Sequence, residues 1–136
     1  MSAALALDVA QQIRQSCKAA GYDAAVAIAD RDGTLRILLS GDTTSAPSVE
    51  AARRKARTSA RFGFPTAALT NASRDAPAYV DFLRSLDPEL MMIGGGMPIR
   101  IRGELVGAAG VGGAPRPESD EACLNVGLTA IASRLK

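Results

Sequence analysis

The chain lacks histidine and tryptophan altogether, and aromatic residues make up only 4% of its 136 positions. Without histidine, it has neither the most common general base at neutral pH nor the most common side-chain ligand of metal ions. A Ser-His-Asp triad and a metal-binding HExxH motif are therefore excluded, and we expect no metal site. Because large rings are scarce, alanine, leucine and valine must fill most of the core.

Strong charge and long apolar runs are also missing. The formal net charge is only +2, which is too small to favour nucleic acid or an anionic membrane as a partner. No segment approaches the roughly 20 apolar residues that a membrane-spanning helix needs. The N-terminus has no basic region, and Asp8 interrupts its short apolar run, so we expect no secretion signal and a cytoplasmic location.

The chain has only two cysteines, Cys17 and Cys123, and each lies on the apolar stripe of a separate expected helix. Cysteines in such positions are typical of buried, reduced thiols. Reduced thiols suit a reducing compartment, in agreement with the cytoplasmic location.

The length and the order of the expected elements predict a single α+β domain over residues 1–136. Two strand hairpins are expected, at 24–30 with 35–40 and at 98–102 with 104–111. Helical spacing or proline-led starts predict helices at about 5–17, 47–62, 65–71, 77–86, 88–92 and 117–135. A succession of helix, hairpin, helices, hairpin and helix favours an antiparallel sheet covered by helices.

Glycine is concentrated in one place, because eight of the thirteen glycines fall between Gly94 and Gly113. Such a density indicates a backbone that turns tightly or is approached closely by a ligand or another element. The run Gly94-Gly95-Gly96 suggests a phosphate loop, but no Gly-Lys-Ser/Thr ending follows it, and it leads into a strand. A turn that lines a pocket is therefore favoured over a nucleotide site.

The expected helix over 47–62 has three different faces. One is a narrow face of small residues that predicts close packing on a sheet, namely Val49, Ala52, Ala56 and Ala60. Lys55 and Thr58 share another face, where the lysine either pairs with a carboxylate of a ligand or extends to solvent. The hydroxyl of Thr58 either binds the ligand or bonds back to the preceding turn.

The third face of this helix is basic. Glu50 and Arg54 form a helix-stabilising pair at i,i+4, and Arg57 and Arg61 extend the same flank. A solvated surface is the simplest interpretation of Arg57 and Arg61. Nearer the glycine turn, the pair Met91-Met92 offers thioethers, which fill apolar gaps far more often than they bind iron.

Four stretches together resemble the GlcG/HbpS family, which includes the C-terminal domain of PduO. They are Val26–Gly33, Glu50–Gly63, the glycine-rich region Gly94–Gly113 except residues 100–102, and Asp120-Glu121-Ala122. Each stretch alone is weakly specific, but they span nearly the whole chain in the order found in the family.

The resemblance implies a profilin-like sandwich with a five-stranded antiparallel sheet flanked by helices. It also implies a homo-oligomer that binds haem or a related small ligand. The matching positions that would face the ligand are Lys55 and Thr58 on the helix and, on the opposite wall, Gly94, Gly95, Gly96 and Met97. Arg54, beside Lys55 on the helix, is a further candidate for ligand binding. Since the chain has no histidine, haem would need an oxygen ligand, a methionine or pocket contacts alone.

Three hypotheses follow from these patterns and from the resemblance. The first is a domain that binds haem or a tetrapyrrole, with Lys55 or an arginine on the propionates. The alternative is a cofactor-independent enzyme of the tautomerase, isomerase or lyase type that acts on a small carboxylate or hydroxy acid, using a lysine, carboxylate or tyrosine base. The third is a structural module whose alanine face and glycine-rich strands pack subunits together.

Overall fold

One antiparallel sheet of four strands lies at the centre of the computed structural model, which describes residues 1–136. The strands are β1 (Ala25–Asp30), β2 (Leu35–Leu39), β3 (Gly96–Ile101) and β4 (Glu104–Gly112). Their order in the sheet is β2-β1-β4-β3, so the two predicted hairpins are present and meet through β1 and β4. The α+β class is confirmed.

The number of strands implied by the family resemblance, five, is wrong for this chain. Only the four segments with a strand pattern pair in the sheet. The segment that precedes β3 makes hydrogen bonds with side chains of two helices. The amide of Met91 donates to the hydroxyl of Thr58 at 2.8 Å, and the hydroxyl of Thr70 donates to the carbonyl of Met92 at 3.0 Å. No strand forms in this segment.

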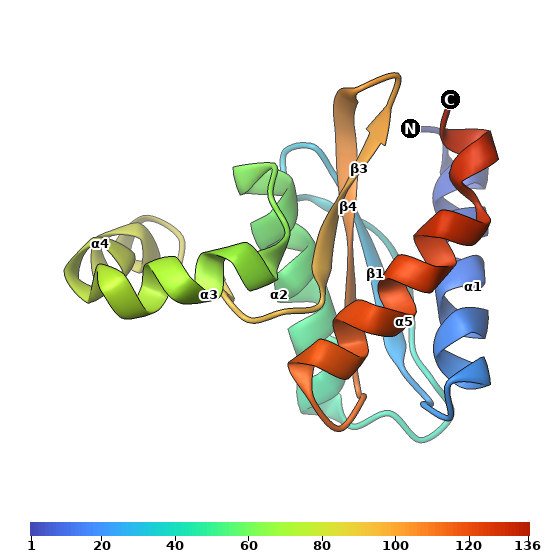
Figure 1. Ribbon diagram of the computed structural model, residues 1–136, viewed down its shortest axis with the longest axis horizontal. Coiled ribbons are helices and arrows are strands. Elements are labelled where there is room, and N and C mark those ends of the chain that lie inside the picture. Colours follow the sequence, from blue (N-terminus) through green and yellow to red (C-terminus); the bar gives the residue numbers. More distant parts are fainter.

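The chain also forms five α-helices and a short 3₁₀ helix, η1 (Figure 1). They are α1 (Ala3–Ala19), α2 (Ala46–Phe62), α3 (Thr66–Asp75), α4 (Pro77–Leu86), α5 (Pro117–Ala130) and η1 (Ala132–Leu135). Three long predicted helices are therefore present, but the helix expected at 88–92 is not formed and α3 continues beyond residue 71. None of the helices has the length and apolar character needed to span a membrane.

The two faces of the sheet are packed differently. Helices α1 and α5 cover one face, and large residues such as Ile13, Ile28 and Leu124 form the main core there. Helix α2 covers the other face through a layer of seven alanines, Ala25, Ala27, Ala29, Ala52, Ala56, Ala60 and Ala108. Alternate residues of each central strand face opposite sides, so the small residues predicted on the helix meet small residues on the strands.

Glycines of β4 allow α2 to lie directly on the sheet. A methyl group at Gly110 would overlap the carbonyl oxygen of Ala52, and one at Gly112 would overlap that of Ser48. The glycine-rich strand is therefore a surface of close approach, as its composition predicts, and the element that approaches it along β4 is α2.

The two cysteines form a disulfide, so the prediction of reduced thiols is wrong. Cys17 in α1 and Cys123 in α5 are 106 residues apart in the sequence, with their Cα atoms 4.8 Å apart. Their separate helical stripes pack against the same face of the sheet and meet there, which periodicity alone could not indicate. The disulfide also removes reduced thiols as a reason to expect a cytoplasmic location.

Helices α3 and α4 form an arm that extends from the body of the molecule, with α4 at its end (Figure 1). A small third cluster holds the arm, formed by Val80 with Leu90 and Met92 of the following segment. On the outer side of α4, Tyr79, Phe82 and Leu86 remain 60%, 54% and 69% exposed.

Candidate functional site

Lys55 lies in a buried ion pair where α2, β4 and α5 meet. Its ammonium group donates to Oδ2 of Asp120 at 2.7 Å and to the carbonyl oxygen of Val111 at 3.0 Å. The other carboxylate oxygen of Asp120 accepts from the amide of Ala114 at 3.0 Å. Both side chains are only about one-twentieth exposed, at 5% and 6%. The charge of Lys55 is therefore neutralised within the chain.

The glycine turn packs on this ion pair. Gly95 has a φ of +118°, and a Cβ atom at this position would lie 2.9 Å from Nζ of Lys55. The carbonyl oxygen of Gly95 accepts from the amide of Val111 at 2.8 Å, and a Cβ atom at Gly96 would lie 2.6 Å from the backbone oxygen of Lys55. The structure thus brings Lys55, Gly95 and Gly96 together as one tightly packed wall.

The other predicted site residues, on α2 and β3, lie away from this wall. The hydroxyl of Thr58 donates to the carbonyl of Arg54 at 2.7 Å while it accepts from Met91, so it joins α2 to the segment before the turn. Arg54 pairs with Glu50 at 3.0 Å on the outer flank of α2. Met97 is half-buried and packs against the main core, on the side of the sheet opposite α2.

The largest cavity, of about 610 Å³, lies between α3 and α5, and we call it the α3–α5 cavity. It is lined by Ala67, Thr70, Asn71, Arg74, Ile93, Gly94, Pro117, Glu118, Glu121, Ala122 and Asn125. Of the predicted site residues, only Gly94 lines it, and it is the neighbour of the Lys55 wall. Lys55 and Asp120 do not line it but border a smaller cavity of about 230 Å³. The ion pair still contacts two elements that border the α3–α5 cavity, the glycine turn through Gly95 and the first turn of α5 through Asp120.

The α3–α5 cavity carries charges of both signs that the chain itself leaves free. Arg74 lies on α3, facing Glu118 and Glu121 on α5 across the cavity. None of these three side chains takes part in an ion pair or a hydrogen bond within the protein. Such groups are available to a polar or charged part of a ligand.

Sequence reasoning missed Arg74 and the two glutamates, although a signal was present. Residues 67, 70, 71 and 74 follow helical spacing and form one face of α3, and residues 118, 121, 122 and 125 do the same on α5. Because the helix before the arm is predicted to end at 71, Arg74 falls outside it. The spacing shows which residues share a face, but not that the two faces oppose each other.

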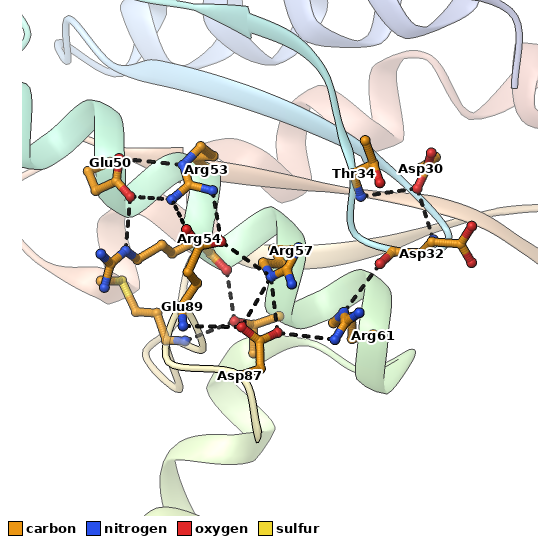
Figure 2. A network of polar contacts seen from close by, with 12 residues as sticks. Asp30, Asp32, Thr34, Glu50, Arg53, Arg54, Arg57, Arg61, Asp87 and Glu89 are labelled. Carbon is orange, nitrogen blue, oxygen red and sulfur yellow. Dashed lines mark hydrogen bonds and ion pairs between the residues drawn. The ribbon is translucent and has the colours of Figure 1, made fainter. Parts of the chain in front are cut away.

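The basic flank of α2 is an internal network (Figure 2). Arg57 and Arg61 both bind the buried carboxylate of Asp87, at 3.0 and 3.3 Å. Arg61 is 44% exposed, as a solvated surface predicts, whereas Arg57 is only 24% exposed. Arg53 joins Glu50 to Glu89, the latter at 2.8 Å. Hydrogen bonds from Arg53 and then Arg54 lower the pKa of Glu50 to about 2. This network connects α2 to residues 87–89 and leaves no acid–base group free.

Comparison with solved structures supports the fold. HbpS from Streptomyces reticuli, in a double-mutant form, is 28% identical, with a TM-score of 0.86 over 96% of this chain and 86% of that chain. The Klebsiella pneumoniae protein ORFY is 19% identical, with a TM-score of 0.86 over 98% and 91% of the two chains. A complex of PduOC with haem is 22% identical, with a TM-score of 0.82 over 91% and 89%. The last two likenesses show the fold alone.

No curated protein matches the chain in sequence. Among protein families, the one described as "Haem degrading protein HbpS-like" matches residues 1–129. This match covers nearly all of the chain, in agreement with the four stretches that carry the resemblance to GlcG/HbpS proteins. The chain therefore belongs to the HbpS-like family.

Proposed function

We propose that the chain binds haem or a related tetrapyrrole in the α3–α5 cavity. The observation that carries this proposal is a cavity of about 610 Å³ in a chain whose family is described as haem degrading. That volume lies within the range of about 300 to 1,000 Å³ that is usual for small-molecule sites. Ala67, Ile93 and Ala122 offer apolar contact to a macrocycle, and the guanidinium of Arg74 can pair with a propionate.

The cavity does not fit the usual ligation of haem iron. Histidine, cysteine, methionine and tyrosine are the common axial ligands, and none of these residue types lines it. The only ionised oxygen donors there are the carboxylates of Glu118 and Glu121. We therefore assign affinity to contacts with the macrocycle and to Arg74, and we derive no step through the iron. Lys55, which is engaged by Asp120, holds the wall of the cavity rather than a propionate.

Titration with haemin tests this proposal directly. The Soret band of haemin should shift and saturate near one equivalent per chain. Ala67→Trp should abolish the saturable shift because the indole fills the cavity, whereas Ala68→Trp, an exposed neighbour on α3 outside the lining, should leave it unchanged. Arg74→Ala should weaken affinity about fivefold, the effect of losing one partly exposed ion pair.

A metal-free control separates the macrocycle from the iron. Protoporphyrin IX, followed by its fluorescence, should bind within a few-fold of haemin because the lining lacks a strong iron ligand. Absorbance that rises without saturation, or equal behaviour of Ala67→Trp and Ala68→Trp, would contradict the assignment of the cavity. A strong preference for haemin over protoporphyrin would contradict the role given to the macrocycle.

The enzyme alternative gains no support from these observations. The comparisons do not favour it, and of the expected bases the α3–α5 cavity contains no lysine or tyrosine and only the carboxylates of Glu118 and Glu121. A cytoplasmic location remains a prediction, which the disulfide weakens because reducing compartments seldom preserve such bonds.

We further propose that the chain forms a homo-oligomer through the outer side of α4. Tyr79, Phe82 and Leu86 follow helical spacing and leave an apolar stripe at the end of the arm, away from the sheet (Figure 1). Apolar patches of this kind on a projecting element mark interfaces in soluble proteins. A second copy of the chain offers the same stripe, so a twofold arrangement covers both.

Light scattering after size exclusion measures the expected effect. Phe82→Asp should lower the measured molar mass of the oligomer, because it places a charge in the middle of the apolar stripe. Val126→Asp provides a matched control, since Val126 is 61% exposed but lies on α5. A monomeric wild-type chain, or dissociation by Val126→Asp alone, would rule out the α4 interface.

A further inference from the structure

We propose that the Cys17–Cys123 disulfide is a thiol–disulfide exchange site at which a small amino-acid-type thiol becomes attached to Cys123. A second cavity, of about 310 Å³, lies between the C-terminal end of α1 and the first turns of α5. Tyr22, Arg116, Glu118 and Ser119 line it together with Cys123. It adjoins the α3–α5 cavity, because Glu118 and Ala122 line both, but Cys123 and Arg116 line only this one. The proposal does not depend on tetrapyrrole binding.

The two sulfurs are not equivalent toward this cavity. Both cysteines are buried, at 3% exposure for Cys123 and 0% for Cys17, but only Cys123 lines the cavity. In thiol–disulfide exchange a thiolate attacks one sulfur and the other sulfur leaves, so access decides which cysteine reacts. An incoming thiolate therefore reaches Sγ of Cys123, and Cys17 is the leaving group.

The reaction balances with the thiol as the only co-reactant. A bond forms between the thiol sulfur and Sγ of Cys123 while the bond between Cys123 and Cys17 breaks. Cys17 leaves as a thiolate and takes a proton from solvent, so the incoming thiol is oxidised as the Cys17 sulfur is reduced. A second thiol can then attack the mixed disulfide, which releases the symmetrical disulfide and leaves the Cys123 thiol.

Two unpaired charges at the cavity define the class of thiol. Arg116 and Glu118 are exposed, carry opposite charges and make no ion pair or side-chain hydrogen bond within the protein. A carboxylate can bind the guanidinium of Arg116, and an ammonium group can bind the carboxylate of Glu118. Both groups occur together in amino acids and short peptides, so a zwitterionic thiol fits better than a neutral one.

Peptide mapping of the folded protein tests the site. The wild-type chain is incubated with L-cysteine or with neutral 2-mercaptoethanol at equal thiolate concentrations, and free thiols are then blocked with iodoacetamide. We expect the thiol adduct on Cys123 and the blocking group on Cys17, with a rate that rises in proportion to thiol concentration. L-Cysteine should react faster than 2-mercaptoethanol.

Matched variants test the recognition of charge. Arg116→Ala should slow the reaction with L-cysteine about fivefold, as expected for one exposed ion pair, and leave that with 2-mercaptoethanol unchanged. Arg84→Ala, which removes an arginine from α4 outside this cavity, should alter neither rate. An adduct on Cys17, or a rate independent of thiol concentration, would overturn the proposal because either result indicates exchange through unfolding. Equal slowing of both thiols by Arg116→Ala would overturn the role of the charges.

Discussion

Lys55→Ala should lower the free energy of unfolding by about 3 to 5 kcal/mol, the usual cost of removing one partner from a buried ion pair. The variant leaves the carboxylate of Asp120 buried without a counter-charge and deprives the carbonyl of Val111 of its donor. The glycine turn and the start of α5 also lose a shared support. Chemical denaturation followed by circular dichroism measures the loss.

A double variant separates the cost of the orphaned charge from the value of the pair. In Lys55→Met with Asp120→Asn, the asparagine can still accept from Ala114 and no buried charge remains, so the loss should be smaller than the sum of the single effects. Arg54→Ala is the control from the same helix. Its pair with Glu50 is 36% and 45% exposed, and its loss should stay within about 1 kcal/mol. Equal losses for Lys55→Ala and Arg54→Ala would contradict a structural role for the buried pair.

Replacement of both cysteines, Cys17→Ser with Cys123→Ser, should lower the free energy of unfolding by about 4 to 5 kcal/mol. The disulfide closes a loop across 106 residues, and a crosslink over so long a loop removes much of the conformational freedom of the unfolded chain. Since small domains are stable by only about 5 to 15 kcal/mol, this loss is a large share of the total. Denaturation in guanidinium chloride gives the measurement.

Reduction of the wild-type chain provides an independent comparison, because it breaks the same bond without a mutation. The reduced wild type and the double variant should unfold at similar denaturant concentrations, and neither should respond to further reductant. A loss below about 1 kcal/mol, the typical effect of a single substitution, would show that the packing between α1 and α5 holds these helices without the crosslink.

The general architecture could be predicted from periodicity because its causes are local. Alternation along β1 places Ala25, Ala27 and Ala29 on one face, and helical spacing places Ala52 and Ala56 toward them. Both patterns depend only on backbone geometry. The density of glycine likewise indicated that another element approaches β4 closely, because glycine weakens a strand and is typical of positions where a second backbone packs against it.

The errors arose where two distant segments meet. Cys17 and Cys123 each looked like one apolar residue of a helix, and nothing in either helix shows that the other lies within bonding distance. The ion pairs of Arg57 and Arg61 were missed because Asp87, their partner, lies 26 to 30 residues further along the chain. The fifth strand came from resemblance alone and has no corresponding run in the sequence.

In the candidate site, too, local patterns could be predicted and contacts between distant segments could not. Periodicity identified Lys55 and Thr58 as unusual for a helix surface, and both are buried. Their partners, Asp120 for the lysine and the amide of Met91 for the threonine, come from later segments. These partners engage the groups that a ligand would otherwise bind. The cavity with unpaired charges lies in another place, between α3 and α5.

By itself, the sequence determined the α+β class, the two hairpins, the closely packed glycine strand and the absence of histidine chemistry. These features follow from composition and from spacing along one element, which fixes the direction of each side chain relative to its own backbone. Only the tertiary structure decided that the cysteines are bonded, that Lys55 is neutralised by Asp120, and that Arg74 faces Glu121 across a cavity. Each of these depends on the distance between elements far apart in the chain, which packing of the whole domain sets.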